Sequence, residues 1–107
     1  MVQPANLRIG GLELNDLSKE VLLDGDSISL TPKEFDILKL LMMNPGQVFS
    51  PKEIYRRVWK EAPLNSDNTV AVHIRHIREK IEIDPADPRY LKVIFGQGYK
   101  MEGDRRI

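Results

Sequence analysis

Apolar residues in the first thirty positions form short runs separated by Gly-Gly or Asp-Gly, which predicts a small antiparallel sheet over residues 7–30. The segment LRIGGLELN offers two apolar pieces joined at Gly10-Gly11. The segment KEVLLDGDSISL predicts a hairpin, because its Asp-Gly pair is a favoured two-residue turn. Four side chains are expected on the buried face: Leu12, Leu14, Val21 and Leu23.

Two later segments share one helix-start signature, TPKE at residues 31–34 and SPKE at residues 50–53. In each, the hydroxyl residue can be the N-cap, proline takes the first helical position, and glutamate can bond back to the cap amide. We therefore expect helices over residues 32–44 and 51–60. Apolar residues surround the first helix, which indicates a central core position, whereas the second mixes apolar residues with cations.

The segment NTVAVHIRHIREK, residues 68–80, is amphipathic at the period of an α-helix. Its apolar stripe comprises Val70, Ile74, Ile77 and Ile81. The opposite face carries Asn68, Val72, Arg75, His76 and Glu79. A helix over residues 67–83 is predicted, with Asp67 as its N-cap. The segment RYLKVIFGQGYKMEG then predicts a β-hairpin over residues 90–102 that turns at Gly-Gln-Gly.

The chain of 107 residues is long enough for one domain with a modest core. Apolar residues make up 41% and charged residues 30%, which is ordinary for a globular protein in water. No apolar run approaches the roughly 18 residues of a membrane span, and no signal peptide is recognisable. Cysteine is absent, which excludes disulfides and thiolate metal sites and fits a cytoplasmic protein.

The formal net charge is zero, yet the charges are unevenly distributed. Residues 1–34 carry three basic and six acidic side chains, whereas residues 35–107 carry thirteen basic and ten acidic ones. Residues 50–60 alone hold four cations against one anion. A local positive patch is what phosphate binding requires, although chance clustering of solvated charges gives the same pattern.

His73 and His76 are spaced so that both could reach one metal ion. Zinc needs three or four ligands and only a carboxylate such as Glu79 is nearby, so a metal-dependent sensor is the weakest alternative. Catalysis by a histidine base needs a nucleophile and an orienting acid, and neither has a recognisable motif. Gly-Gln-Gly at residues 96–98 precedes no helix and therefore predicts a turn rather than a phosphate cradle. We expect no cofactor, no metal and no enzymatic activity.

A basic helix, a loop and a second helix with one apolar stripe follow the helix-turn-helix plan, in which the second helix enters the major groove of DNA. On that plan four residues face base edges: Asn68, Val72, Arg75 and His76. His73, Arg78 and Lys80 would lie beside phosphates, and the following hairpin would reach the backbone or minor groove. For His73, a packed or half-exposed structural role is an equal interpretation.

Several segments in this order resemble the effector domain of OmpR/PhoB-type response regulators, winged-helix transcription factors of bacterial two-component systems. The segment LTPKEFDILKLLMMNPGQVFS resembles the first helix and its exit. Val58-Trp59, NTVAVHIRHIREKI and GQGY match the second helix, the recognition helix and the wing. The resemblance implies an α+β fold: a winged helix-turn-helix with an N-terminal four-stranded antiparallel sheet, three helices and a C-terminal β-hairpin wing.

The resemblance also implies partners and contact residues. In the family the recognition helix reads double-stranded DNA at a direct-repeat operator, where two domains usually bind head to tail. Alone, this domain is expected to be a weakly binding monomer, because one module makes few phosphate contacts. Backbone contacts are then expected from Trp59, Thr69, His73, Arg78, Lys80 and Tyr99, and the wing comprises Phe95, Gly96 and Gly98. The family's loop that meets RNA polymerase corresponds to Lys60, Glu61, Ala62, Pro63, Leu64, Asn65, Ser66 and Asp67.

Family members carry an N-terminal receiver domain that is phosphorylated under the control of a sensor kinase. Because 107 residues cannot hold both domains, we expect an excised effector domain without a phosphorylation site. Asn68 stands where many members carry arginine, and Ala71 where an acidic residue is common. Phe95 replaces a wing arginine that others put into the minor groove, which should reduce A·T preference. Phe95 and VHIRHIREK together are similar to VanR-type glycopeptide-resistance regulators.

The alternative from another functional class is a winged-helix module that binds protein and no specific DNA. Zero net charge, the acidic first third of the chain and Phe95 in the wing favour it. It predicts a partner on the sheet or on the loop over residues 60–67, and no salt-dependent affinity for DNA.

Overall fold

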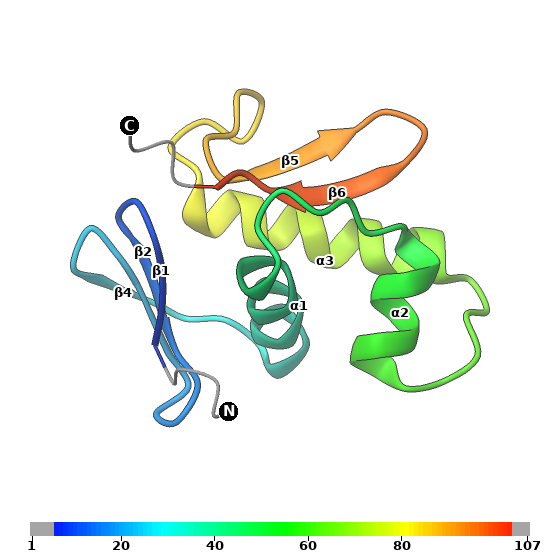
Figure 1. The fold of residues 1–107 in the computed structure, drawn as a ribbon, viewed down its shortest axis with the longest axis horizontal. Helices are drawn as coiled ribbons and strands as arrows, with labels where there is room; N and C mark the ends of the chain where they lie inside the picture. The colour runs from blue at the N-terminus through cyan, green and yellow to red at the C-terminus, as the bar shows by residue number, and fades with distance from the viewer. Residues whose placement is uncertain (1–5, 104–107) are drawn as a thin grey trace.

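The computed structural model describes residues 6–103, and Figure 1 shows a sheet at one end, α2 at the other end and a hairpin lying beside α3. In chain order the elements are β1 (Asn6–Ile9), β2 (Leu12–Asn15), β3 (Glu20–Leu23), β4 (Asp26–Ile28), α1 (Pro32–Met43), α2 (Pro51–Trp59), α3 (Ser66–Ile81), β5 (Leu91–Ile94) and β6 (Gly98–Met101). The predicted winged-helix architecture, with four antiparallel strands, three helices and a wing, is confirmed. None of these described helices is long and apolar enough to cross a membrane.

The N-terminal sheet is a meander in the order β1-β2-β3-β4, with each strand antiparallel to the next. Asp24 and Gly25 have positive φ angles of 51° and 86°, the conformation that a two-residue hairpin turn needs. The side chains expected on the buried face lie in the core, although Leu23 is only partly buried. The sheet thus closes one end of the hydrophobic core.

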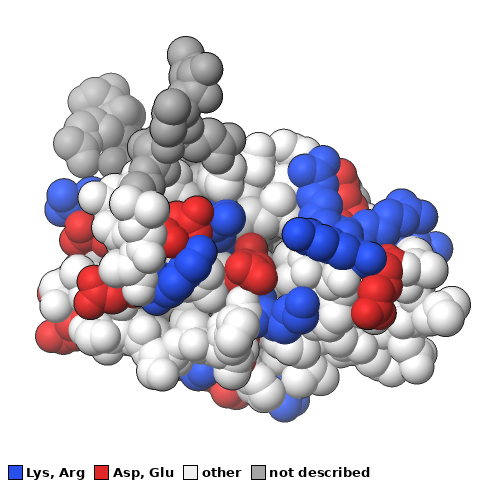
Figure 2. Space-filling view, turned by 90° about the horizontal axis from the view of Figure 1, so that it is seen from below, with Lys and Arg blue, Asp and Glu red and all other residues white. Residues whose placement is uncertain are grey.

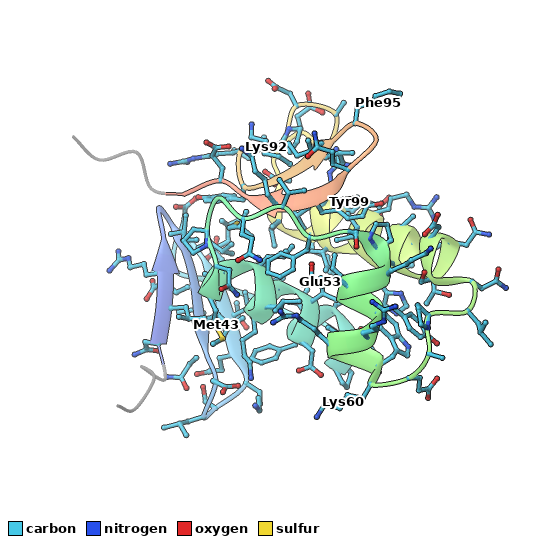
Figure 3. The ribbon with its side chains drawn as sticks, turned by 45° about the vertical axis from the view of Figure 1, so that its right-hand side comes forward. Met43, Glu53, Lys60, Lys92, Phe95 and Tyr99 are labelled. Atoms are coloured by element: carbon cyan, nitrogen blue, oxygen red, sulfur yellow. The ribbon has the colours of Figure 1, made fainter. Side chains whose placement is uncertain are left out.

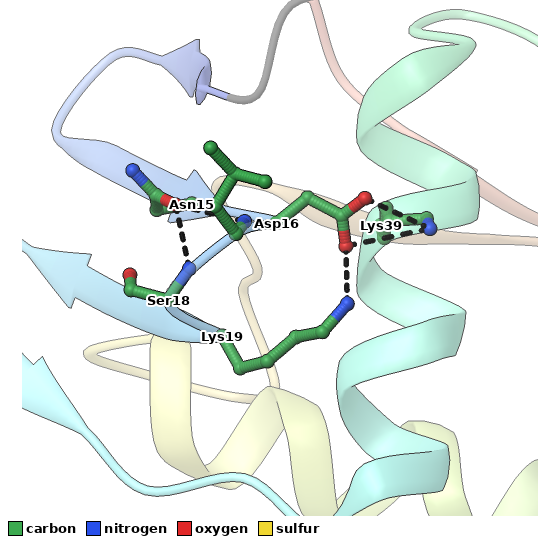
Figure 4. A network of polar contacts seen from close by, with 6 residues as sticks. Asn15, Asp16, Ser18, Lys19 and Lys39 are labelled. Atoms are coloured by element: carbon green, nitrogen blue, oxygen red, sulfur yellow. Dashed lines mark hydrogen bonds and ion pairs between the residues drawn. The ribbon is translucent and has the colours of Figure 1, made fainter.

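A polar network ties the β2–β3 turn to α1 (Figure 4). The Asn15 side chain closes the turn by accepting a hydrogen bond from the Ser18 backbone N–H at 2.9 Å. The Asp16 carboxylate pairs with Lys19 at 2.7 Å and with Lys39 of α1 at 3.3 Å. The hydrogen bond from Lys19 is the main cause of a lowered pKa at Asp16. The network therefore holds the sheet against the first helix.

α1 is the central helix, because apolar residues cover most of its circumference. Its capping box is complete: the Thr31 hydroxyl accepts from the Glu34 N–H at 3.2 Å, and the Glu34 carboxylate accepts from the Thr31 N–H at 3.1 Å. The helix ends at Met43, one residue before the predicted end, where Asn44 leaves the helical conformation. The buried apolar residues are Phe35, Ile37, Leu38, Leu41 and Met42.

α2 has only half of the predicted capping box. The Ser50 hydroxyl accepts from the Glu53 N–H at 3.1 Å, but the Glu53 carboxylate turns along the helix and pairs with Arg57 at 3.3 Å. The predicted bond back to the cap amide is therefore wrong here, because the partner one turn later competes for the carboxylate. The helix ends at Trp59, and Lys60 adopts a left-handed φ of 60° that starts the loop.

α3 begins one residue earlier and ends two residues earlier than the sequence predicts. The N-cap is Asn65, with a left-handed φ of 57° and no side-chain cap bond, so the prediction of Asp67 as N-cap is wrong. At the other end, Glu82 is extended and buried. Its carboxylate accepts backbone hydrogen bonds from Arg89 and Leu91 at 2.7 and 2.8 Å, which draws the chain away from the helix axis.

The wing packs on the helices through Leu91 and Met101, which are fully buried. Tyr99 of β6 exchanges two backbone hydrogen bonds with Phe49, at 2.8 and 2.9 Å, so the segment before α2 extends the hairpin. Only glycine fits at position 98, because a Cβ there would lie 2.0 Å from the Phe49 carbonyl oxygen. This close approach fixes the wing relative to α2.

Candidate nucleic-acid interface

α3 is fixed in the fold by one face and leaves the opposite face open. It packs against α1 and α2 on one flank, and the wing runs along it on the other (Figure 1). The apolar stripe predicted from the sequence is buried: Val70, Ile74, Ile77 and Ile81. The open face carries Asn68, Ala71, Val72, Arg75 and Glu79, of which Ala71 was not predicted to lie on this face.

Three of the four residues predicted to read bases stand on this open face. Asn68 and Arg75 are exposed, and Val72 is 43% exposed although its side chain is purely apolar. The Arg75 Nε lies 4.0 Å from the Glu79 carboxylate, an exposed pair that adds little stability and leaves the guanidinium available. An amide, an aliphatic branch and a guanidinium therefore project side by side from one rigid helix.

The fourth predicted residue, His76, stands at the edge of the open face. Its Nδ1 lies 3.7 Å from a carboxylate oxygen of Glu34 on α1, which is an ion-pair distance rather than a hydrogen bond. The His76 side chain is 42% exposed, so one edge of the ring faces the protein and part of it faces solvent. The structure thus separates His76 from the other three residues.

The residues predicted near the DNA backbone on the α2 flank pack against one another. The His73 Nδ1 lies 2.7 Å from the Thr69 carbonyl oxygen, and the ring meets Trp59 edge-on with centroids 5.0 Å apart. Trp59 in turn stacks on Tyr55 with centroids 4.9 Å apart. All four side chains are half-buried. They join α2 to α3, and their outer edges are the parts that a phosphate could reach.

Two cations predicted to hold phosphates have partners inside the protein. The Arg78 guanidinium donates to the Pro85 carbonyl oxygen, and its buried Nε has no hydrogen-bond partner among residues 6–103. The Lys80 Nζ lies 2.7 Å from a carboxylate oxygen of Glu34. Both side chains lie on the flanks of α3; Arg78 is half-buried, whereas Lys80 is exposed and still pairs with Glu34.

Phe95 stands at the tip of the wing, 97% exposed and pointing away from the body of the domain (Figure 3). The turn behind it is closed by a hydrogen bond from the Gln97 N–H to the Ile94 carbonyl oxygen at 3.0 Å. Tyr99 lies lower on the wing and is half-buried. Burial, assisted by the nearby Asp67, raises the pKa of the Tyr99 hydroxyl, so the phenol stays a neutral hydrogen-bond donor.

Two wing lysines were absent from the predicted contacts, and strand alternation puts them on the face of the hairpin opposite the buried Leu91 and Met101. Lys92 and Lys100 are directly opposite each other in the β5–β6 register, where like charges repel. The Lys92 Nζ donates to the Pro88 carbonyl oxygen, and the Lys100 Nζ lies 4.0 Å from Glu102. A signal was available in KVIFGQGYK, which has lysine at both ends of a predicted hairpin.

The eight residues predicted to meet RNA polymerase form the α2–α3 loop and the start of α3. Lys60 marks the beginning of the loop, at the end of α2 that is farther from the wing (Figure 3). Left-handed residues stand at both ends, with φ angles of 60° at Lys60 and 57° at Asn65. Between them Leu64 is 79% exposed, which gives the loop one prominent apolar side chain.

Positive charge gathers on the helical part of the molecule. Figure 2 shows Lys and Arg side chains concentrated toward the α2 end, with acidic side chains more frequent around the sheet. Arg56 and Arg57 of α2 are exposed, and the Arg57 guanidinium lies 5.6 Å from the centre of the Phe49 ring. A neutral domain with one acidic and one basic end can still orient toward a polyanion.

The two histidines of α3 do not converge on one point. His73 faces Trp59 and the Thr69 carbonyl group, whereas His76 faces Glu34. Within residues 6–103, no group of three or more His, Cys, Asp or Glu side chains is placed to hold a metal ion.

Comparison with known proteins decides the family. Residues 25–101 match the family model described as "Transcriptional regulatory protein, C terminal". The chain belongs to the OmpR/PhoB family of transcription regulators. It is a DNA-binding effector domain of the response-regulator type, and this family of transcription regulators is not a class of enzymes.

The OmpR/PhoB domain is 41% identical over 95 residues to the uncharacterized transcriptional regulatory protein YcbL of Bacillus subtilis, covering 89% of this chain and 42% of YcbL. It is also 41% identical to the regulatory protein VanR of Enterococcus faecium, over 86% of this chain and 40% of VanR. SphR of Synechococcus elongatus has the same identity, over 92% and 38%, so these figures do not single out the VanR type. The chain spans about two fifths of the length of these curated relatives.

Solved structures show the same fold. The response regulator DrrB, an OmpR/PhoB homologue of Thermotoga maritima, has a TM-score of 0.85 at 34% identity, covering 92% of this chain and 45% of DrrB. The DNA-binding domain of CpxR from E. coli has a TM-score of 0.79 at 30% identity, covering 92% and 96%. The Klebsiella pneumoniae RstA DNA-binding domain, solved with the RstA box, has a TM-score of 0.84 at 23% identity, covering 91% and 96%, and adds agreement in fold.

Proposed function

We propose that this domain regulates transcription by sequence-specific binding of double-stranded DNA, with α3 in the major groove. The observation that carries the proposal is the open face of α3, where Asn68, Val72 and Arg75 project from a helix whose other face is fixed in the core. These side chains are the chemical groups that read adenine, the thymine methyl group and guanine. Membership in the OmpR/PhoB family supports the same function.

Phosphates on the two sides of the groove would meet the two flanks of α3. On the α2 flank the outer edges of Trp59, Thr69 and His73 would meet phosphates, while the wing flank offers the Tyr99 hydroxyl. Arg78 and Lys80 would contribute only after their internal hydrogen bonds rearrange. Phe95 would lie along the sugars beyond the wing tip, because an uncharged ring has no attraction for phosphate.

For the whole protein we infer a receiver domain and a cognate sensor kinase, since the chain spans about two fifths of relatives named as regulatory and sensory transduction proteins. One domain alone would bind as a monomer and weakly, and two copies would bind a direct repeat head to tail. RNA polymerase would meet the loop over residues 60–67, where exposed Leu64 provides an apolar contact.

The test is selection from a random duplex pool, followed by measurement of the dissociation constant for the selected and a scrambled duplex at two salt concentrations. We expect a recovered motif and an affinity that falls as salt rises. Arg75→Ala should weaken binding to the selected duplex by about 1–3 kcal/mol and relax specificity at one base pair. Arg8→Ala is the control, because Arg8 is exposed on β1. An equal loss on both duplexes would assign Arg75 to a phosphate instead.

A protein-interaction module is the second candidate, because Phe95 and Leu64 are large, apolar and exposed while the net charge is zero. Under it, selection returns no motif from either the single domain or a tandem fusion of two copies. The folded state of both preparations would be checked by circular dichroism. A recovered motif would reject this alternative.

A further inference from the structure

Glu34 is a buried carboxylate that lies under the edge of the recognition helix. Its side chain is 3% exposed, and the carboxylate already serves as the second half of the α1 capping box. Burial by itself raises the pKa of such a group, but the hydrogen bonds from Lys80 and the Thr31 amide outweigh it, and the pKa of Glu34 lies below its ordinary value. Glu34 is therefore an anion at neutral pH.

The anion divides its two oxygens between two residues of α3. Oε1 accepts from the Lys80 Nζ at 2.7 Å, and Oε2 lies 3.7 Å from the His76 Nδ1. With Nδ1 turned toward Glu34, Nε2 is the ring nitrogen left for a partner outside the domain. The His76 side chain is 42% exposed and lies next to the open face of α3, where a bound duplex would place its phosphates.

We propose that Glu34 is a positioning residue for DNA binding, which holds the Nδ1 edge of His76 so that Nε2 donates to a backbone phosphate and the imidazole takes up a proton on binding. The inference rests on the proposed function. In the complex His76 would stand between two anions, the Glu34 carboxylate 3.7 Å from Nδ1 and the phosphate at Nε2, and two nearby negative charges favour the imidazolium over the neutral ring. Affinity for DNA should then rise as pH falls through the range in which histidine titrates.

Among the described charged residues near His76, Glu34 is the acidic one that faces it from another helix. Lys80, one turn later on α3, is bound to the same carboxylate. On α3 the nearby Arg75 and Glu79 pair with each other. His73, the other titratable group close by, faces Trp59. Lys33 of α1 is directed elsewhere, since its Nζ lies 3.3 Å from the Val58 carbonyl oxygen.

The proposal is tested by measuring the dissociation constant for the selected duplex between pH 6 and pH 8 at constant salt. For the unaltered domain we expect the affinity to rise about fivefold from pH 8 to pH 6, well within the limit of about tenfold per pH unit that the uptake of one proton sets. Glu34→Gln and His76→Gln should both flatten this profile to less than about twofold. Glu34→Gln retains an oxygen for the Thr31 amide, so the cap is preserved.

Glu53→Gln is the matched control, because Glu53 occupies the same position in the start of α2 and pairs with Arg57 rather than with a histidine. Its profile should equal that of the unaltered domain. A profile that stays steep in Glu34→Gln but is flat in His76→Gln would remove Glu34 from the proposal, and a steep profile in both would assign the proton to another group.

A second measurement uses the unaltered domain alone, so it does not depend on how Glu34→Gln folds. Nitrogen-15 chemical shifts of the His76 ring, recorded with and without duplex at pH 7.5, should move toward the imidazolium form when DNA binds. Unchanged shifts in a specific complex would refute the positioning role. Failure of the unaltered domain to prefer the selected duplex at any pH would refute the proposed function itself.

Discussion

Replacing Glu82 by glutamine tests whether one buried carboxylate holds the wing to the end of the recognition helix. Glu82 is 7% exposed, and its oxygens accept backbone hydrogen bonds from Arg89, Tyr90 and Leu91 at 2.7 to 3.2 Å. These N–H groups belong to the segment that starts β5. Glutamine has nearly the same shape but replaces one acceptor oxygen by an amino group, which would then point at N–H donors.

The magnitude follows from the distribution of these bonds. Tyr90 contacts both oxygens, so it keeps an acceptor whichever way the amide is turned, whereas either Arg89 or Leu91 loses its acceptor. A hydrogen bond to a charged group contributes about 1.5–3 kcal/mol, and an unpaired buried N–H costs about 1–3 kcal/mol. We therefore expect Glu82→Gln to lower the free energy of unfolding by about 3 kcal/mol, out of the roughly 5–15 kcal/mol of a typical domain.

Urea unfolding followed by circular dichroism gives the free energy, and hydrogen exchange locates the loss. In Glu82→Gln the exchange rate should increase much more at the amides of residues 89–91 than at the amides in the middle of α1. Glu20→Gln is the control, because Glu20 is exposed on β3 and its substitution should stay within about 0.5 kcal/mol of the unaltered domain. A comparably small change for Glu82→Gln, or unaltered exchange at residues 89–91, would refute the assignment of the wing anchor to this carboxylate.

Three further outcomes follow from single contacts. Gly98→Ala should lower the free energy of unfolding measured in urea by more than about 2 kcal/mol, because its Cβ would lie 2.0 Å from the Phe49 carbonyl oxygen. Gly96→Ala is the comparison: a Cβ there meets nothing within 4 Å, so alanine costs only about 1 kcal/mol of backbone strain. Phe95→Arg should leave the urea midpoint unchanged, since the ring is 97% exposed, and should strengthen DNA binding more at low than at high salt; an affinity independent of salt would contradict the place of the wing beside phosphates. The pKa of Glu34 is lowered in the folded state, so its contribution to stability is present above the ordinary value of 4.5 and is lost as pH falls through the folded value. Below pH 5 the urea midpoint should therefore fall less steeply with pH in Glu34→Gln than in the unaltered domain, and parallel curves of midpoint against pH would contradict this.

The elements of this domain were predictable because their signals are local. The turn at Asp24-Gly25 and the capping box at Thr31 depend on residues within four positions of one another, and both are present as predicted. The errors have equally physical causes. Glu53 bonds to Arg57 instead of the cap amide, and α3 stops early because buried Glu82 belongs to the wing, which begins several residues later in the chain. Competition between two partners for one carboxylate cannot be decided from spacing alone.

The candidate interface was predictable in its centre and not at its edges. Asn68, Val72 and Arg75 lie opposite the buried stripe, so no neighbouring element can reach them whatever the packing, and the helical wheel is sufficient. His76 and Lys80 lie nearer the flank, where an angle on the wheel does not say which helix will be adjacent. Their partner, Glu34, is 46 residues away from Lys80 in the chain.

The same distinction bears on how strongly DNA binding by this domain should depend on salt. A count of cations includes Arg78 and Lys80 as available to phosphate. In the fold, however, the Arg78 guanidinium donates to a carbonyl oxygen and the Lys80 Nζ pairs with a buried carboxylate. Each phosphate contact adds about 0.9 to the slope of the logarithm of affinity against the logarithm of salt. Cations that remain bound inside the domain add nothing to that slope. The domain would therefore depend less on overall charge, and more on the few groups projecting from the open face of α3, than its lysine and arginine content implies.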